Sequence, residues 1–144
     1  IRGRLEARLY VTACIGVLDA QAKTVSVSNA GHPPVYHRTG DGQVTELDCT
    51  GRPLGLRTET TYEARTVPVH PGDVLVFYSD GTYESRDHVA RDYGFDRLKE
   101  TIQRAGAEGS AEDILEWILL DIKRFVGVAP VEDDMTVVVV KVSC

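Results

Sequence analysis

The chain has 144 residues, of which 42% are hydrophobic and 26% are charged, and its formal net charge is −6. This length and composition are ordinary for a globular protein that buries its own core, so we expect a single domain over residues 1–144. The acidic balance and the lack of a clustered lysine and arginine surface argue against a nucleic-acid partner.

No segment of the sequence indicates a membrane or secretion. No apolar run approaches the ~18 residues that span a bilayer, and no signal peptide pattern is present. The three cysteines, Cys14, Cys49 and Cys144, are odd in number and form no CxxC pair. Neither a disulfide framework nor a thiolate zinc site is indicated, and a reducing cytoplasm is the compartment we expect.

The first half of the chain is predicted to form antiparallel strands joined by short turns. The apolar or alternating segments that carry this prediction are 9–18, 25–28, 35–37, 44–47 and 61–69. Gly40-Asp41-Gly42 joins the third and fourth strands as a hairpin, because glycine allows a positive φ. Pro68 cannot donate a ladder hydrogen bond, so the fifth strand lies near a sheet edge or is bulged there.

The second half is predicted to contain a buried strand, two helices and a final strand. The strands are the apolar runs 74–78 and 137–140, and the helices are periodic stripes over 95–105 and 111–126. Ser110 is a good N-cap for the second helix. This order of elements predicts an α+β fold, with a largely antiparallel sheet covered by helices.

Acidic residues stand beside both of these buried strands. Asp80 follows the first strand, and Asp133 and Asp134 precede the second. If the two strands are antiparallel neighbours, the carboxylates converge at one edge of the sheet, with residues 85–92 as an irregular surface loop over that edge. Converging carboxylates repel one another unless a cation lies between them.

Two interpretations of these carboxylates remain open on spacing alone. Asp80-Gly81 could be a turn and Asp133-Asp134 a strand cap. Alternatively, the carboxylates hold Mg²⁺ or Mn²⁺, which are hard cations that take oxygen ligands. A two-metal site of this kind clamps a phosphoryl group, and it usually needs at least three carboxylates.

Two further loops, 29–34 and 51–55, are rich in glycine and proline. His32 in the first could be a general acid or a ligand, but fixing the loop by local hydrogen bonds is the commoner role. Arg52 in the second could bind a phosphate, although an ordinary surface arginine is the commoner case. The other histidines show no metal-ligand spacing and are interpreted as incidental: His37, His70 and His88.

Five motifs occur in chain order: Asn-Ala-Gly-His-Pro-Pro at 29–34, Gly-Arg-Pro-Leu-Gly at 51–55, Tyr-Ser-Asp-Gly-Thr-Tyr-Glu at 78–84, Tyr-Gly-Phe-Asp-Arg-Leu at 93–98 and Asp-Asp-Met-Thr at 133–136. This series closely resembles the bacterial PPM-type serine/threonine phosphatases. It is most similar to the branch that includes the sporulation stage II phosphatase E and the stress-response sigma-factor regulators. The resemblance covers roughly residues 8–142.

The resemblance implies a β-sandwich flanked by helices, with two Mn²⁺ or Mg²⁺ ions that activate water against phosphoserine or phosphothreonine. Residue by residue, Asp80 and Asp133 match metal ligands of the family, and Asp134 is a weaker candidate beside them. No catalytic side chain is assigned. The implied substrate is a phosphorylated regulatory protein of the anti-sigma-factor antagonist type, and the implied upstream neighbours are sensor or receiver domains.

One family motif has no counterpart in this chain. The family carries an earlier Asp-Gly or Asp-Val-x-Gly-His-Gly motif whose aspartate bridges both metals. We therefore expect an N-terminally truncated chain, the C-terminal part of a PPM-type phosphatase domain, with an incomplete two-metal site and a sheet edge or apolar face covered by a neighbour. The rival interpretation is a catalytically silent phosphoprotein-binding module, and a carboxylate-metal nuclease is disfavoured by the acidic charge.

Overall fold

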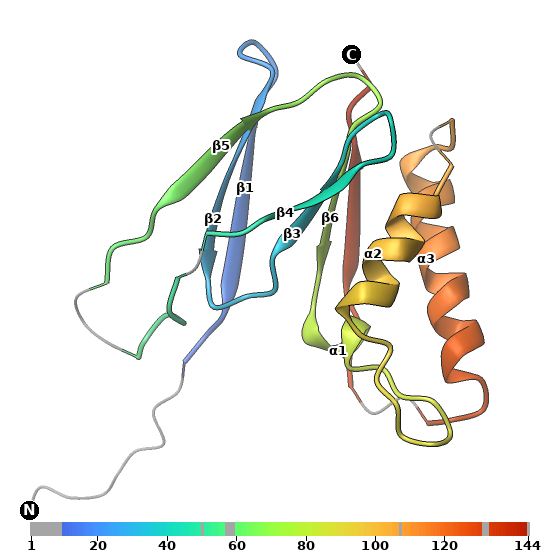
Figure 1. The fold of residues 1–144 in the computed structure, drawn as a ribbon. Coiled ribbons are helices and arrows are strands. Elements are labelled where there is room, and N and C mark those ends of the chain that lie inside the picture. The colour runs from blue at the N-terminus through green and yellow to red at the C-terminus, as the bar shows by residue number, and fades with distance from the viewer. Residues whose placement is uncertain (1–9, 50, 57–59, 107, 131–132, 144) are drawn as a thin grey trace, which may run out of the picture. The chain divides into compact units, whose positions relative to one another are not determined.

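The computed structural model describes residues 10–49, 51–56, 60–106, 108–130 and 133–143. The chain forms two compact units, Ile1–Pro34 with Asp48–Pro68, and Val35–Leu47 with Val69–Cys144. Each unit has an antiparallel sheet of its own, and the helices of the described residues all belong to the second unit (Figure 1).

The first unit is a three-stranded sheet with the order β1-β2-β5. Its strands are β1 (Ala13–Asp19), β2 (Thr24–Ala30) and β5 (Ala64–Pro68). In β2 the alternation seen in the sequence matches burial, because Val25 and Val27 are fully buried. Asp19 closes the β1–β2 turn by accepting hydrogen bonds from the backbone amides two and three residues further on. The predicted hairpin is confirmed, and so is the edge position of the strand that ends at Pro68.

The second unit contains a four-stranded sheet with the order β4-β3-β6-β7, in which every neighbouring pair is antiparallel. Its strands are β3 (Val35–Arg38), β4 (Val44–Leu47), β6 (Val74–Tyr78) and β7 (Val137–Lys141). The predicted hairpin between β3 and β4 is confirmed, and Gly42 has the positive φ, +93°, that its turn requires.

Two helices, α2 (Phe95–Arg104) and α3 (Ala111–Val126), cover one face of the second sheet (Figure 1). Buried apolar residues at helical spacing make the contact with the sheet: Leu98, Ile102, Ile114, Ile118 and Ile122. Helix α3 begins with a capping box, in which the side chains of Ser110 and Asp113 each accept a hydrogen bond from the other's backbone amide. Both predicted helices and the α+β class are confirmed.

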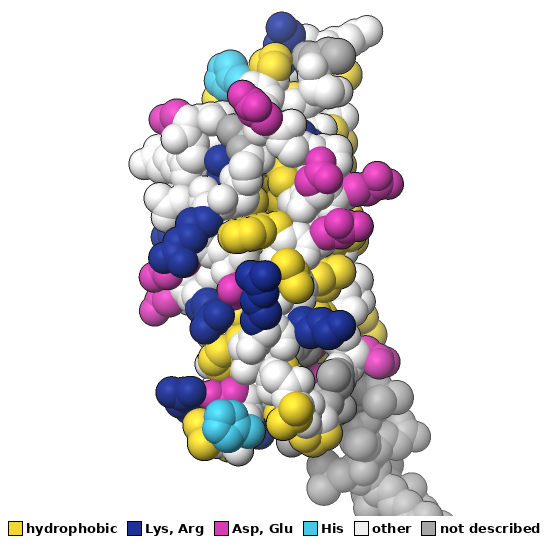
Figure 2. Space-filling view, turned by 90° about the vertical axis from the view of Figure 1, so that its right-hand side faces the viewer, with side chains coloured by type: hydrophobic (Ala, Val, Ile, Leu, Met, Phe, Trp, Pro, Cys, Tyr) yellow, Lys and Arg dark blue, Asp and Glu magenta, His cyan; other side chains and the backbone are white. Residues whose placement is uncertain are grey.

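The outer surface of α2 and α3 is mixed in character. Figure 2, which views this side, shows hydrophobic side chains among lysine, arginine and acidic ones. Acidic residues occupy the first turn of α3 and basic residues its last turn, as the helix dipole favours. Three large hydrophobic side chains of α3 are between 41% and 42% exposed: Trp117, Leu119 and Leu120. Among the described residues, no helix is both long and apolar enough to span a bilayer.

Candidate metal centre

The end of β6 and the beginning of β7 lie side by side. The two strands pair antiparallel, with Tyr78 opposite Val137. Asp80 follows Tyr78 by two residues, and Asp133 and Asp134 stand just before β7, so both acidic segments meet at the same edge of the sheet. The two segments meet as predicted, whereas the convergence of their carboxylates stays a prediction. We call this edge, with its three aspartates, the acidic edge.

Ser79 ties the two segments of the acidic edge together. Its backbone amide donates to the Thr136 carbonyl at 3.0 Å, and its Oγ accepts from the Thr136 amide at 2.9 Å. The same hydroxyl donates to the Asp134 carbonyl at 3.4 Å. The sequence pattern did not reveal this role, because a serine beside an Asp-Gly pair carries no periodic signal.

Gly81 is required by the close approach of the opposite segment. A Cβ added at Gly81 would lie 2.5 Å from the Asp134 carbonyl oxygen and 3.6 Å from the Asp133 carbonyl carbon. The glycine is buried and the clash is with backbone atoms, so only a shift of one segment away from the other could relieve it. The Asp-Gly pair therefore brings the two acidic segments into contact and does more than reverse the chain.

Asp80 opens a short helix, α1 (Asp80–Tyr83), that the sequence pattern did not predict. At its end, Tyr83 stacks on Phe95 with ring centroids 4.0 Å apart and meets the Tyr78 ring edge-on at 6.3 Å. Burial raises the pKa of the Tyr83 hydroxyl, and the neighbouring carboxylates of Glu84 and Asp80 raise it further. These aromatic contacts hold α1, and hence Asp80, at the end of β6.

The three carboxylates of the acidic edge are exposed, and none forms an ion pair with a described lysine, arginine or histidine. Asp80 Oδ1 accepts only from the Gly81 amide at 3.0 Å, and Asp133 Oδ1 accepts from the Asp134 amide at 2.8 Å. Anionic oxygens without a cationic partner are the donors that Mg²⁺ and Mn²⁺ prefer, so the chemistry of these residues fits a divalent cation.

The carboxylates of the acidic edge do not form a closed metal site by themselves. Within the described ranges, no group of three or more histidine, cysteine, aspartate or glutamate side chains could hold a metal ion. A two-metal site usually takes at least three carboxylates placed around the ions, so the acidic edge as arranged supplies part of a ligand set. The assignment of Asp80, Asp133 and Asp134 as metal ligands therefore stays a prediction.

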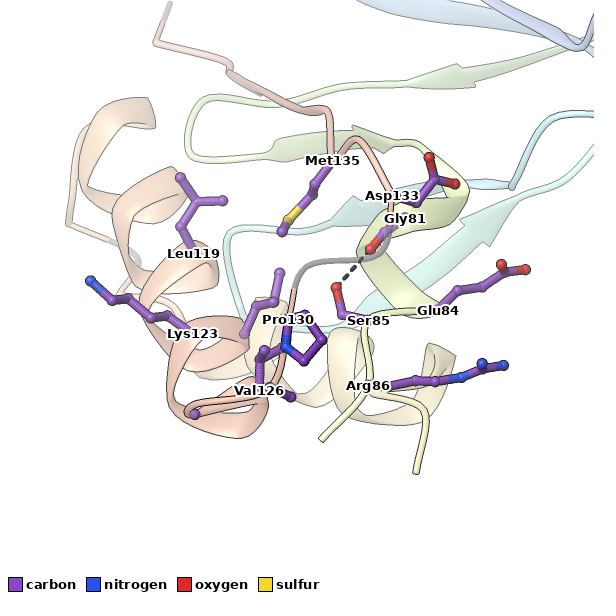
Figure 3. Close-up of a pocket in the computed structure, with 13 residues that line it drawn as sticks. Gly81, Glu84, Ser85, Arg86, Leu119, Lys123, Val126, Pro130, Asp133 and Met135 are labelled. Carbon is purple, nitrogen blue, oxygen red and sulfur yellow. Dashed lines mark hydrogen bonds between the residues drawn. The ribbon is translucent and has the colours of Figure 1, made fainter. Parts of the chain in front are cut away.

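A cavity of about 540 Å³ lies beside the acidic edge. It is bordered by Gly81, Ser85 and Asp133 on one side and by the C-terminal half of α3 on the other (Figure 3). Ser85 Oγ donates to the Gly81 carbonyl at 2.7 Å, which fixes the segment that follows α1 along this border.

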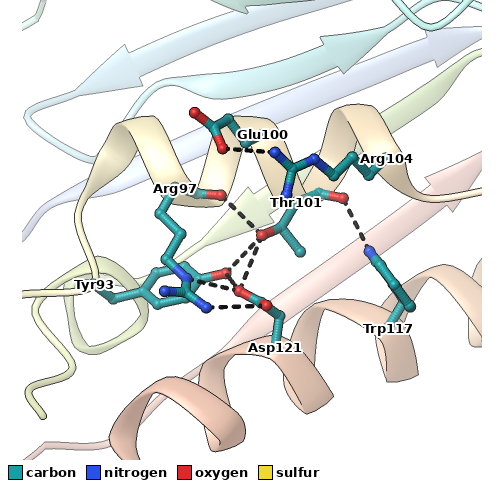
Figure 4. A network of polar contacts seen from close by, with 7 residues as sticks. All are labelled: Tyr93, Arg97, Glu100, Thr101, Arg104, Trp117 and Asp121. Atoms are coloured by element: carbon teal, nitrogen blue, oxygen red, sulfur yellow. Dashed lines mark hydrogen bonds and ion pairs between the residues drawn. The ribbon is translucent and has the colours of Figure 1, made fainter.

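A polar network between α2 and α3 supports that same segment (Figure 4). Asp121 accepts from Arg97 Nε at 2.9 Å and from the Tyr93 hydroxyl at 2.8 Å, and the hydrogen bond from Arg97 lowers the pKa of Asp121. The Tyr93 amide in turn donates to the Ser85 carbonyl at 2.8 Å. The predicted surface loop over 85–92 is confirmed as irregular chain, and this network anchors its two ends.

Asn29 organises the loop over 29–34 in the first unit. Its Nδ2 donates to the His32 carbonyl at 2.7 Å, and its Oδ1 accepts from the His32 amide at 2.8 Å. A Cβ added at Gly31 would lie 2.5 Å from Pro53 Cγ, and one added at Gly51 would clash with the Asn29 carbonyl. The loop is fixed by Asn29 through the His32 backbone, and a role for the His32 side chain stays a prediction. The two glycine-rich loops pack against each other.

The His37–Asp73 pair corrects the interpretation of His37 as incidental. His37 Nε2 lies 2.9 Å from Asp73 Oδ2, and both side chains are buried. Asp73 also accepts from the backbone amides of Gly40 and His70, each at 3.0 Å. His37 lies in β3 and Asp73 just before β6, and the two share no sequence motif, so no spacing rule could have paired them.

Comparison with known proteins agrees with this geometry. Residues 1–143 match the family described as Stage II sporulation protein E (SpoIIE). The chain belongs to the SpoIIE family. The resemblance drawn from the five ordered motifs is thereby confirmed.

The SpoIIE family members that the chain matches are much longer proteins. Stage II sporulation protein E of Bacillus subtilis is 26% identical over 141 residues, which cover 97% of this chain and 16% of that protein. Phosphoserine phosphatase RsbP of Bacillus subtilis is 30% identical over 95 residues, which cover 66% of this chain and 23% of that protein. The chain thus spans less than a quarter of the length of these relatives.

A solved structure shares the fold. The phosphatase domain of SpoIIE from Bacillus subtilis, presoaked with Mn, matches with a TM-score of 0.71 and 24% identity, over 97% of this chain and 60% of that chain. The likeness confirms the predicted phosphatase-like fold class. Of the relatives reported above, RsbP is named a phosphoserine phosphatase.

Proposed function

We propose that the protein containing this chain is a metal-dependent phosphatase that hydrolyses phosphoserine or phosphothreonine on a regulatory protein. The observation that carries the proposal is the acidic edge. Antiparallel pairing of β6 and β7 brings Asp80 together with the Asp133-Asp134 segment, and their carboxylates lie exposed without a cationic partner among the described residues. Family membership supports the reaction class.

Each residue of the acidic edge has a distinct part in this proposal. Asp80 and Asp133 hold Mn²⁺ or Mg²⁺, and Asp134 is the weaker candidate. Ser79 and Gly81 act as positioning residues, because they fix the two segments against each other. When bound, two such ions clamp a phosphoryl group and lower the pKa of water. Because the described residues form no complete group of ligands, we propose that further ligands come from outside them.

The substrate and setting are inferred from the resemblance. The relative RsbP is named a phosphoserine phosphatase, which supports phosphoserine as the group that is cleaved. We infer a phosphorylated regulatory protein of the anti-sigma-factor antagonist type as substrate. We further infer a chain that forms the C-terminal part of one phosphatase domain, with a sensor or receiver domain upstream, in the cytoplasm.

The test is phosphate release from a phosphoserine peptide by the full-length protein, with Mn²⁺, with Mg²⁺ and with a chelator. We expect phosphate release to depend on metal, and we expect Asp80→Asn and Asp133→Asn each to lower it by more than about a hundredfold. Mutation of a residue that only hydrogen-bonds to a metal ligand already costs up to about a hundredfold, and these two aspartates are proposed to be ligands themselves. The matched control is Asp96→Asn, which changes another exposed aspartate of the second unit that lies in the first turn of α2. Undiminished release by Asp80→Asn would refute the metal assignment.

The second candidate is a catalytically silent module that binds a phosphoprotein. One observation favours it, since the described residues contain no group of three potential metal ligands. This candidate predicts that the full-length protein retains a phosphoserine peptide but releases no phosphate with either metal. Metal-dependent release would exclude it.

A further inference from the structure

The cavity beside the acidic edge has an apolar wall that the proposed chemistry does not use. Leu119 and Val126 of α3 form this wall together with Pro130 and Met135. In Figure 3 the Met135 side chain points toward the α3 side chains, whereas the carboxylate of Asp133 points away from them. The cavity volume, about 540 Å³, lies within the roughly 300–1,000 Å³ of typical ligand pockets.

The cavity and the acidic edge share a border. Asp133 belongs to both, and Gly81, the residue after Asp80, lines the cavity. A peptide whose phosphate sits at the carboxylates of the acidic edge therefore has the cavity within reach of its neighbouring side chains. The shared border therefore favours the peptide substrate, rather than an unrelated small molecule, as the occupant of the cavity.

The lining of the cavity also includes a positively charged side chain. Lys123, in the last turn of α3, lines the cavity and is exposed. Its side chain makes no hydrogen bond or ion pair with any residue that the structure describes. Arg86 on the opposite side is paired with Asp92 at 2.9 Å. An acidic group beside the apolar wall would therefore find its partner in Lys123.

We propose that this cavity receives a large apolar side chain of the phosphoprotein substrate, close in sequence to the phosphoserine, with Lys123 attracting an acidic residue next to it. The proposal rests on the proposed phosphatase function and adds a specificity site to it. The apolar side chain of the substrate would cover Leu119, which is 41% exposed in the chain alone.

The test uses the full-length protein and phosphoserine peptides in an alanine background. Leucine is placed at one position at a time, from three residues before the phosphoserine to three after it. We expect one or two positions at which leucine raises kcat/KM by about tenfold over alanine, the lower range for an apolar group in a fitted pocket. Hydrolysis of p-nitrophenyl phosphate by the same preparation serves as the reference, because that substrate has no peptide.

Two adjacent leucines of α3 provide a matched pair of variants. Leu119 lines the cavity and Leu120 does not, yet they are 41% and 42% exposed. We expect Leu119→Gln to reduce the tenfold preference to about twofold and Leu120→Gln to keep it. In peptides that carry a glutamate beside the preferred leucine, Lys123→Glu should lower kcat/KM severalfold, whereas Arg124→Glu, outside the cavity, should not.

The outcomes separate this inference from the function on which it rests. Absence of metal-dependent hydrolysis of every substrate by the unaltered protein would overturn the proposed function, and the cavity proposal with it. Hydrolysis without any leucine preference, or with the same preference in Leu119→Gln and Leu120→Gln, would overturn the cavity proposal alone. A dimer that dissociates only in Leu119→Gln, with the preference unchanged, would instead assign the cavity to a second copy of the chain.

Discussion

The two ends of β6 carry aspartates in opposite circumstances. Asp73, just before the strand, is 2% exposed and accepts hydrogen bonds from two backbone amides while it faces His37 at 2.9 Å. Asp80, just after the strand, is exposed and accepts only from the neighbouring Gly81 amide. A buried carboxylate with hydrogen bonds to both of its oxygens stabilises the fold, whereas one left open to solvent is available for a ligand.

The largest effect on folding is expected at the buried end of β6. Asp73→Ala leaves His37 and two backbone amides without their acceptor in a buried place, so we expect the free energy of unfolding to fall by about 3 kcal/mol. Urea denaturation, monitored by circular dichroism, measures this free energy of unfolding. Asp96→Ala, which removes an exposed aspartate of the same unit, is the control. Equal stability of the two variants would contradict a stabilising role for Asp73.

The next largest loss of stability is expected at Gly81, where the segment after β6 contacts the segment before β7. Gly81→Ala forces a Cβ to within 2.5 Å of the Asp134 carbonyl, and we expect a loss of about 2 kcal/mol in the free energy of unfolding. Gly106→Ala is the matched control, because nothing lies within 4 Å of a Cβ added there. The same denaturation experiment compares them, and a tolerated Gly81→Ala would contradict the close approach.

A smaller effect is expected at Asp121, whose pKa Arg97 lowers. Because the folded pKa lies below the unfolded value, this carboxylate stabilises the fold above the ordinary aspartate pKa of about 3.9, and the contribution is lost as pH falls through the folded value. We expect Asp121→Asn to cost about 1 kcal/mol at neutral pH and less at pH 3. Measuring the free energy of unfolding of both proteins between pH 3 and neutral pH checks this pH dependence. A destabilisation by Asp121→Asn that grows toward pH 3 would contradict it.

The smallest effect is expected at the exposed end of β6. Asp80→Asn removes a charge that pairs with no described cation, so we expect the free energy of unfolding without metal to change by no more than about 0.5 kcal/mol. Added Mn²⁺ should raise the melting temperature of the unaltered full-length protein and raise that of Asp80→Asn much less. Equal shifts in both proteins would show that Asp80 holds no metal.

Much of the fold and part of the acidic edge could be predicted from the sequence, for reasons that differ from residue to residue. The start of α3 at Ser110 could be predicted because a cap acts through the next three residues. The approach of the Asp80 and Asp133 segments could be predicted because β6 and β7 are adjacent antiparallel strands. The His37–Asp73 contact depends on how β3 and β6 pair, which no local pattern encodes. Helix α1 is too short for periodicity to reveal, and tertiary contacts of Tyr83 hold it.

The valine run of β7 gives the charges of the acidic edge a second effect, which concerns the pairing of this strand with other chains. In the four-stranded sheet β7 is the terminal strand, and Val137–Val140 are four consecutive β-branched residues without proline. Such a strand is a template for pairing between chains, and charged residues on its flanks oppose that. Asp133 and Asp134 stand at one flank of the run and Lys141 at the other. The same aspartates that are predicted to hold metal thus place negative charge at the end of this strand, where charge opposes pairing with another chain.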